Sequence, residues 1–197
     1  MSFKNCEKFE KLVSDFFGSK YAISTDSCTH AIELCLRLIQ PKKKIFFPKR
    51  TYVGIPLLPI KLNLKWGWKN ELWSNYYYIE NTNIVDAAVY WKKNSYINGT
   101  LMCLSFQFQK HINIGRGGMI LTNNKKHFEK LLLLSYDGRK RDIPWRNQNI
   151  SSLGYHYYMT PESALKGIEI FQKKKNINPK KWDYADYPDL SKMRVFQ

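Results

Sequence analysis

The sequence predicts an α/β domain built from layers of helices and short strands. Apolar residues recur at helical spacing in stretches such as 9–17 and 32–39, whereas 45–47 and 101–108 are short apolar runs typical of buried strands. The two kinds of segment alternate along the chain instead of forming separate blocks. This alternation indicates a layered α/β domain.

The N-terminal part is expected to run from a helix through a strand and a polar turn into a second helix. In 9–17 the apolar residues lie on one helical face, and Gly18 follows where that helix should end. Residues 21–23 form a short strand-like run, and the small polar loop 24–29 leads into the helical stretch 32–39. This order places a helix N-terminus at the end of a strand.

The middle of the chain is expected to supply three strands. The first, 45–47, is followed by a proline-containing apolar segment, 53–64. The aromatic stretch 66–78 has no clear period, so no element is assigned to it. Two buried strands are expected at 83–88 and 101–108.

The last predicted elements are one strand and two helices. A glycine-rich turn leads into a strand at 118–122, and helical patterns follow at 127–134 and 161–171. Thr160 is the expected N-cap of the last helix, because proline stands at the first helical position after it.

The end of the chain differs from the rest. Residues 173–197 mix lysine runs, prolines and aromatic side chains without a period. We therefore divide the sequence into a folded domain, residues 1–172, and a basic and aromatic C-terminal arm, residues 173–197.

Composition excludes several classes of protein. With 44% hydrophobic and 24% charged residues in a chain of 197, the sequence is that of a packed domain and not of a disordered one. No window approaches the 18 apolar residues of a membrane span, and the N-terminus lacks the apolar region of a signal peptide, so we expect a cytoplasmic protein. The four cysteines form no CxxC pair and the histidines show no ligand spacing, so no metal site is expected.

The net charge of +16 favours anionic partners. Lysine runs at 42–44, 173–175 and 180–181, interleaved with tryptophans, could contact a nucleic acid. The chain has 25 lysines and only 7 arginines, however, whereas specific phosphate or base recognition tends to use arginine. Nucleic-acid binding is therefore possible but not favoured.

Lys110 is the first candidate for chemistry. It follows an apolar strand and precedes a glycine-rich turn. A partly desolvated amine in that position would have a lowered pKa and could form a Schiff base. The alternative is a solvated surface charge.

Two further places carry candidate groups. Asp86 lies at the end of an apolar strand, where it could cap a helix or pair with the protonated ring nitrogen of pyridoxal phosphate. Ser27, Cys28 and Thr29 offer hydroxyls and free backbone N–H groups at a helix N-terminus, which suits a phosphate but is also the pattern of an ordinary cap.

Six segments, in order, resemble the DegT/DnrJ/EryC1/StrS family of pyridoxal-phosphate-dependent nucleotide-sugar aminotransferases, which have fold type I. They are FEKLVSDFFGSKYAISTDSCTHAIELCLRLI, PKRTYVG, IVDAA, SFQFQKHINIGRGGMILTNN, DGRKRD and GYHYYMTPESALKGIEIFQ. Together they extend from about Phe9 to Gln172. The resemblance implies a trimmed fold type I large domain over residues 1–172, with a three-layer, mostly parallel sheet flanked by helices and without the small C-terminal domain.

The resemblance also assigns roles to individual residues. It makes Lys110 the Schiff-base lysine and the proton shuttle, Asp86 the partner of the pyridine nitrogen, and Tyr52 the residue that stacks on the ring. The cofactor phosphate would be bound by Ser27, Thr29, Ser105 and the backbone of Cys28. The implied reaction is a transamination in a homodimer, in which an amino acid, probably glutamate, gives its nitrogen to the cofactor and a keto group on a nucleotide-linked sugar then accepts it.

The sequence departs from the family pattern at several of these places. Cys28 replaces a glycine, Val89 a glutamine or histidine, and Arg116 a glutamate, while His156 and Tyr158 replace an asparagine and an arginine.

Length is the larger departure. Family members are nearly twice as long, and the stretch 51–86 looks compressed. Either a dimer partner and the arm supply the missing walls, or the chain is a catalytically degenerate member that binds a ligand or a nucleic acid.

Overall fold

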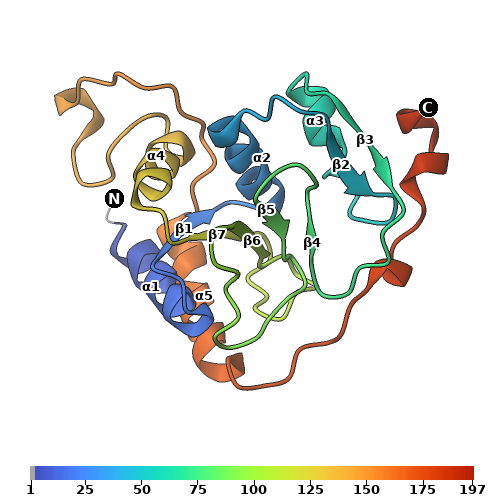
Figure 1. The fold of residues 1–197 in the computed structure, drawn as a ribbon. Helices are drawn as coiled ribbons and strands as arrows, with labels where there is room; N and C mark the ends of the chain where they lie inside the picture. Colours follow the sequence, from blue (N-terminus) through green and yellow to red (C-terminus); the bar gives the residue numbers. More distant parts are fainter. Residues whose placement is uncertain (1–2) are drawn as a thin grey trace.

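A computed structural model describes residues 3–197 as a central five-stranded sheet with helices on both faces (Figure 1). The sheet order is β1-β7-β6-β5-β4. Its strands are β1 (Tyr21–Thr25), β4 (Tyr77–Tyr78), β5 (Ile84–Asp86), β6 (Leu101–Ser105) and β7 (Gly118–Thr122). A separate parallel pair is formed by β2 (Ile45–Pro48) and β3 (Trp66–Lys69). The helices are α1 (Lys4–Phe17), α2 (Cys28–Ile39), α3 (Leu57–Lys61), α4 (Lys125–Ser135) and α5 (Pro161–Lys174).

The expected three layers are confirmed, because successive strand residues point into two different apolar cores. On β6, Met102 and Leu104 pack with α1 and α5, whereas Leu101 and Cys103 pack with α2. On β7, Ile120 packs on the α2 side. Figure 1 shows α1 and α5 side by side on one face of the sheet, with α2 and α4 on the other.

The sequence predicts a mostly parallel sheet, and this is wrong, because most neighbouring strands of the five-stranded sheet run in opposite directions. Within the five-stranded sheet only β5 and β6 pair in parallel, whereas β1 with β7, β7 with β6, and β4 with β5 are antiparallel. The physical reason lies in the connections. No helix lies in 106–117 between β6 and β7, or in 79–83 between β4 and β5, so each second strand returns in the opposite direction.

Two helix ends lie where local chemistry predicts, at Gly18 and Thr160, whereas α1 and α2 begin before the predicted stretches 9–17 and 32–39. The Thr160 hydroxyl accepts a hydrogen bond from the Ser163 backbone N–H at 3.2 Å, which confirms the predicted N-cap of α5. Gly18 ends α1 in a left-handed conformation with φ of 83°. The prediction missed β3 and β4, because the aromatic segment that contains them has neither strand nor helix periodicity.

After α5 the chain runs along the outside of the molecule past β2 and β3 as an extended arm with three short 3-10 turns (Figure 1). These turns are Tyr184–Asp186, Leu190–Lys192 and Arg194–Phe196. Backbone hydrogen bonds attach the arm: the Leu190 N–H donates to the Lys49 carbonyl at 2.8 Å, and the Asn75 N–H donates to the Trp182 carbonyl at 3.1 Å. Leu190 is buried.

A buried ion pair connects three distant segments. Arg141 donates to both carboxylate oxygens of Glu10 on α1, each at 3.0 Å, and both side chains are more than nine-tenths buried. The same carboxylate accepts hydrogen bonds from the backbone N–H and the hydroxyl of Ser24 on β1, both at 2.7 Å. The end of β1, which leads into the Ser27 turn, is therefore fixed to α1 and to the loop that carries Arg141.

Within residues 3–197, no helix is both long enough and apolar enough to cross a bilayer.

Replacing Arg141→Ala should lower the free energy of unfolding by about 3–5 kcal/mol, because it leaves the buried charge of Glu10 without its ionic partner. Urea denaturation followed by circular dichroism measures this. The control is Lys11→Ala, which removes the exposed Lys11–Asp15 pair from the same helix and should cost no more than about 1 kcal/mol. Equal losses in the two variants would contradict the role given to Arg141.

Candidate active site

A cavity of about 660 Å³ lies where the ends of β5 and β6 meet the N-terminus of α2. The arm closes one side of it, through Trp182, Asp186 and Tyr187. All seven residues that the sequence singled out line this one cavity. They are Ser27, Cys28, Thr29, Tyr52, Asp86, Ser105 and Lys110.

The N-terminus of α2 forms one wall. Ser27 is the N-cap of this helix, and its hydroxyl accepts from the His30 N–H at 3.2 Å, so the capping role left open by the sequence is real. Capping does not exclude a phosphate, because the first backbone N–H groups of a helix have no partner within the helix. The Cys28 side chain lines the cavity and also belongs to the apolar core on the α2 side, and burial raises the pKa of its thiol well above the ordinary value.

Gly118 sets the position of this wall. A Cβ atom at residue 118 would lie 2.4 Å from the carbonyl carbon of Ser27 and 2.5 Å from the Cys28 nitrogen. Both contacts are with backbone, which cannot move aside as a flexible side chain can. Glycine at the start of β7 therefore lets the sheet approach the Ser27 turn closely, and the same residue pairs with Ser105 across the β6–β7 ladder.

Asp86 is buried at the end of β5, and its two carboxylate oxygens accept different hydrogen bonds. In the antiparallel β4–β5 pair, Tyr77 lies directly opposite Asp86, and its hydroxyl donates to Oδ2 at 2.6 Å. The Ala88 N–H donates to Oδ1 at 3.0 Å. The Thr51 hydroxyl lies 2.6 Å from that of Tyr77, which extends the network by one buried group.

Burial raises the pKa of Asp86 above its ordinary value, while the hydrogen bonds from Tyr77 and Ala88 and the positive charge of Lys110 act in the opposite direction. The two donors and the lysine therefore favour the ionised carboxylate in surroundings that disfavour it.

Lys110 comes from the loop after β6. Its backbone N–H donates to the Gln107 carbonyl at 2.8 Å, and its ammonium nitrogen lies 4.8 Å from the centre of the Trp182 ring. Burial lowers the pKa of Lys110, the nearby charge of Lys180 lowers it further, and Asp86 and Cys28 oppose the shift. A lowered pKa increases the fraction of neutral amine, which is the nucleophilic form.

Sequence reasoning missed several residues of the cavity wall. Thr51, Trp73 and Tyr77 come from the compressed, aperiodic segment, and Trp182 and Tyr187 come from the arm. The density of aromatic residues in those two segments was the available signal. Aromatic content alone does not show which apolar surface a ring covers.

The departures from the family pattern have local partners. Arg116 lines the cavity and donates to Asp26 at 2.9 Å, and the same carboxylate lies 2.7 Å from the His30 ring nitrogen. His156 lies 2.9 Å from Asp137 and does not line the cavity.

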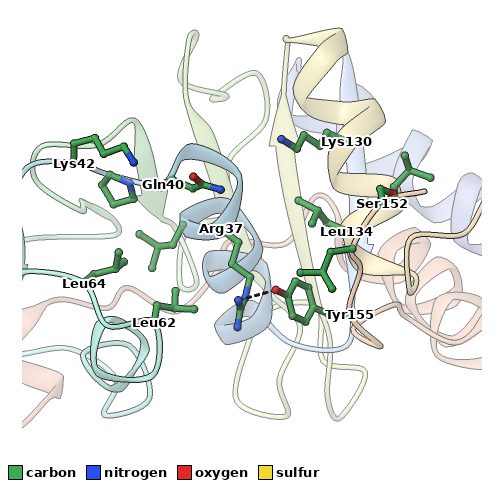
Figure 2. Close-up of a pocket in the computed structure, with 13 residues that line it drawn as sticks. Arg37, Gln40, Lys42, Leu62, Leu64, Lys130, Leu134, Ser152 and Tyr155 are labelled. Carbon is green, nitrogen blue, oxygen red and sulfur yellow. Dashed lines mark hydrogen bonds between the residues drawn. The ribbon is translucent and has the colours of Figure 1, made fainter. Parts of the chain in front are cut away.

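A second cavity, of about 550 Å³, lies between α2 and α4 and contains none of the predicted site residues. Figure 2 shows Leu62 and Leu64 on one side of it, Leu134 and Lys130 on the other, and Arg37 between them. Arg37 donates to the Tyr155 hydroxyl at 2.7 Å and pairs with the buried Glu33, which does not line the cavity. Because no aspartate or glutamate of residues 3–197 lines this cavity, it does not offer the carboxylate and amine of the first.

Residues 1–58 and 88–189 match the model of the DegT/DnrJ/EryC1/StrS aminotransferase family. The chain belongs to this family. The stretch between the two matched ranges, residues 59–87, contains β3, β4 and β5, so both Asp86 and its partner Tyr77 lie outside the match.

Relatives and solved structures agree with the assignment. An uncharacterized protein of Methanocaldococcus jannaschii is 26% identical over an alignment 231 positions long, which covers 90% of this chain and 59% of that protein. The sugar aminotransferase CalS13 of Micromonospora echinospora superposes with a TM-score of 0.72 at 12% identity, covering 86% of this chain and 60% of the other. A putative PLP-dependent aminotransferase of Bacillus cereus has a TM-score of 0.71 at 16% identity, with 87% and 59% covered.

These comparisons confirm a trimmed fold type I architecture. The chain spans about 60% of the length of the proteins that it matches.

Replacing Gly118→Ala should lower the free energy of unfolding by at least about 2 kcal/mol, because the added methyl group meets the backbone of Ser27 and Cys28. Thermal or urea denaturation measures the loss. Gly67→Ala is the matched control, since its Cβ meets no backbone but only side chains, the movable end of Lys44 and the edge of the Phe46 ring, and it should cost less than Gly118→Ala. A Gly118→Ala variant as stable as Gly67→Ala would show that the close approach is not a constraint.

Replacing Asp86→Asn should raise the melting temperature of the cofactor-free protein at pH 7 by at least about 2 °C. Burial raises the pKa of Asp86 in the folded state above its value of about 3.9 in the unfolded chain. As the pH rises from the unfolded pKa through the folded one, the unfolded chain gives up its proton first, so the folded state loses stability relative to it. The advantage of the amide should disappear below about pH 4, where both folded and unfolded chains hold the proton. Calorimetry at both pH values checks this, and an asparagine variant that is less stable at pH 7 would contradict it.

Proposed function

We propose that the protein is a pyridoxal-phosphate-dependent aminotransferase that transfers an amino group from an amino acid, glutamate, to a keto group of a nucleotide-linked sugar. The observation that carries the proposal is the meeting of Lys110, Asp86 and the Ser27 turn in one cavity, within a chain that belongs to an aminotransferase family. The sugar is proposed because CalS13, which shares the fold, is a sugar aminotransferase.

The residues of the cavity fit pyridoxal phosphate. The cofactor carries an aldehyde, a ring nitrogen that must stay protonated, and a phosphate, and the cavity offers an amine, a buried carboxylate and a helix N-terminus. Ser27, Thr29, Ser105 and the backbone N–H of Cys28 would hold the phosphate, and Tyr52 would cover the ring. When bound, the cofactor supplies an electron sink for the charge left by removal of a proton from the substrate carbon.

Lys110 has two tasks in this proposal. Its neutral amine binds the cofactor, which its lowered pKa favours. Once released, the same nitrogen would move a proton between the substrate carbon and the C4′ carbon of the cofactor. Trp182 lies against the amine and covers it on the arm side.

Asp86 holds the ring-nitrogen proton. Each of its oxygens accepts one hydrogen bond, from Tyr77 or from Ala88, and a carboxylate has further lone pairs for a third donor. The two existing donors orient the carboxylate and favour its charged form. Tyr77 therefore takes the place of the polar neighbour that Val89 does not provide.

We also propose that the chain acts as a homodimer. Tyr52 is 57% exposed and Phe108 is 61% exposed at the rim of the cavity, and a second copy would cover these rings.

Reducing the protein with borohydride after incubation with pyridoxal phosphate should fix a pyridoxyl group on Lys110, because the reagent converts the double bond between the amine and the cofactor to a stable single bond. Peptide mass mapping locates the adduct. Lys110→Ala should lose it, whereas Lys125→Ala, which alters an exposed lysine of α4, should keep it. If Lys110 carries no adduct, or if surface lysines are labelled equally, the proposed function is wrong.

A further inference from the structure

A smaller hollow of about 180 Å³ adjoins the cofactor cavity on the side of the arm. The two share six lining residues: Ala88, Val89, Ser105, Gln109, Lys110 and Trp182. A water molecule takes up about 30 Å³ of liquid, so the hollow has room for about six waters. It can hold a carboxylate or a phosphate group of a larger ligand, but not a nucleotide.

The lining of this hollow is positively charged. Lys110, Lys174 and Lys180 line it together with His111, and no aspartate or glutamate does. Among residues 3–197, neither Lys174 nor Lys180 has a carboxylate within 4.0 Å. The lysines next to them in the sequence, Lys173 on α5 and Lys181 on the arm, do not line the hollow.

Two of these ammonium groups lie at the same aromatic ring. Lys180 Nζ is 3.9 Å and Lys110 Nζ is 4.8 Å from the centre of the Trp182 ring. Their mutual repulsion contributes to the lowered pKa of Lys110. An anion beside them would relieve this repulsion, so the arrangement favours a negatively charged group.

A second and independent observation concerns Trp91. This residue lines the hollow and is only 7% exposed, and its ring stacks on Phe16 with centroids 4.8 Å apart. Its indole N–H has no hydrogen-bond acceptor within residues 3–197. A buried donor without an acceptor is costly. The N–H itself is closed to solvent, so Trp91 contributes a wall of the hollow, and its indole resonance reports on a ligand bound against that wall.

His111 belongs to the same wall. Its Nε2 lies 2.9 Å from the carbonyl oxygen of Lys174, and because a carbonyl can only accept, Nε2 carries the hydrogen. This bond joins the Lys110 loop to the C-terminal end of α5 and so fixes the distance between the two lysine-bearing segments.

We propose that Lys174, Lys180 and Trp91 form an anion-binding subsite next to Lys110, which takes a carboxylate or phosphate group of the substrate. Its use in the reaction rests on the proposed function. An amino-acid donor carries its carboxylate on the carbon from which Lys110 would remove the proton, so a subsite beside Lys110 would fix that carbon near the amine. The lysines that do this come from the end of α5 and from the arm.

The test uses the cofactor-free protein and does not depend on turnover. L-glutamate and inorganic phosphate are titrated separately, and the indole N–H resonance of Trp91, assigned with Trp91→Phe, is followed by NMR. We expect at least one of the two anions to shift this resonance in a saturable manner. A shift with glutamate alone identifies a carboxylate subsite, and a shift with phosphate alone identifies a phosphate subsite. If neither anion shifts it, the subsite does not exist.

Matched lysine variants separate the subsite from general charge. Lys180→Gln and Lys174→Gln should each raise the dissociation constant about tenfold, as expected for loss of one charge-assisted hydrogen bond. Lys181→Gln and Lys173→Gln remove the same charge from the adjacent positions and should leave it unchanged. Equal weakening by all four would overturn the proposal.

Failure of the subsite and failure of the proposed function give different results. If borohydride traps the cofactor on Lys110 but no anion shifts Trp91, only the subsite is wrong. If the anions bind and Lys110 is never labelled, the subsite stands and the aminotransferase activity does not.

Discussion

The buried carboxylate of Glu10 determines where one wall of the cavity, the turn that contains Ser27, can lie. It joins α1, the end of β1 and the loop of Arg141, which are far apart in the sequence. Ser24, which it holds, is three residues before Ser27, so the position of the Ser27 turn follows from this contact and from the close approach of Gly118. Glu10 does not line the cavity, yet it fixes the cavity wall, because Ser24 and Ser27 are joined by only two residues.

Asp86 differs from Glu10 because its burial lowers the stability of the fold. A carboxylate buried at the end of a strand opposes folding, and the protein surrounds it with Tyr77, Ala88 and Lys110 to keep its charge. Groups of this kind are typical of functional sites, because a packed apolar residue would serve the fold better. The scaffold charge of Glu10 is fully paired within the protein, whereas Asp86 keeps lone pairs for a ligand.

Much of the fold and of the cavity could be predicted from the sequence, for a physical reason. Asp86, Ser105 and Ser27 stand at the ends of strands or at the start of a helix, and periodicity locates the elements themselves. The bounds are less well predicted, because the strand expected at 101–108 ends at Ser105 and the one expected at 83–88 ends at Asp86. Their roles in cofactor binding stay predictions, although all seven candidates line one cavity. Strand pairing could not be predicted, because it depends on contacts between distant segments. Tyr77 and Trp182 were missed because they lie in segments without a period.

The position of Trp182 also has a consequence for the order in which the chain is made. Lys110 and Asp86 leave the ribosome well before the arm, so the amine is open to solvent on that side until the arm docks. The strands of the sheet and the buried residues of both apolar cores precede the arm in the sequence, and the attachment of the arm includes the Lys49 and Asn75 backbone contacts. The wall next to the amine is therefore made later than the scaffold that it covers.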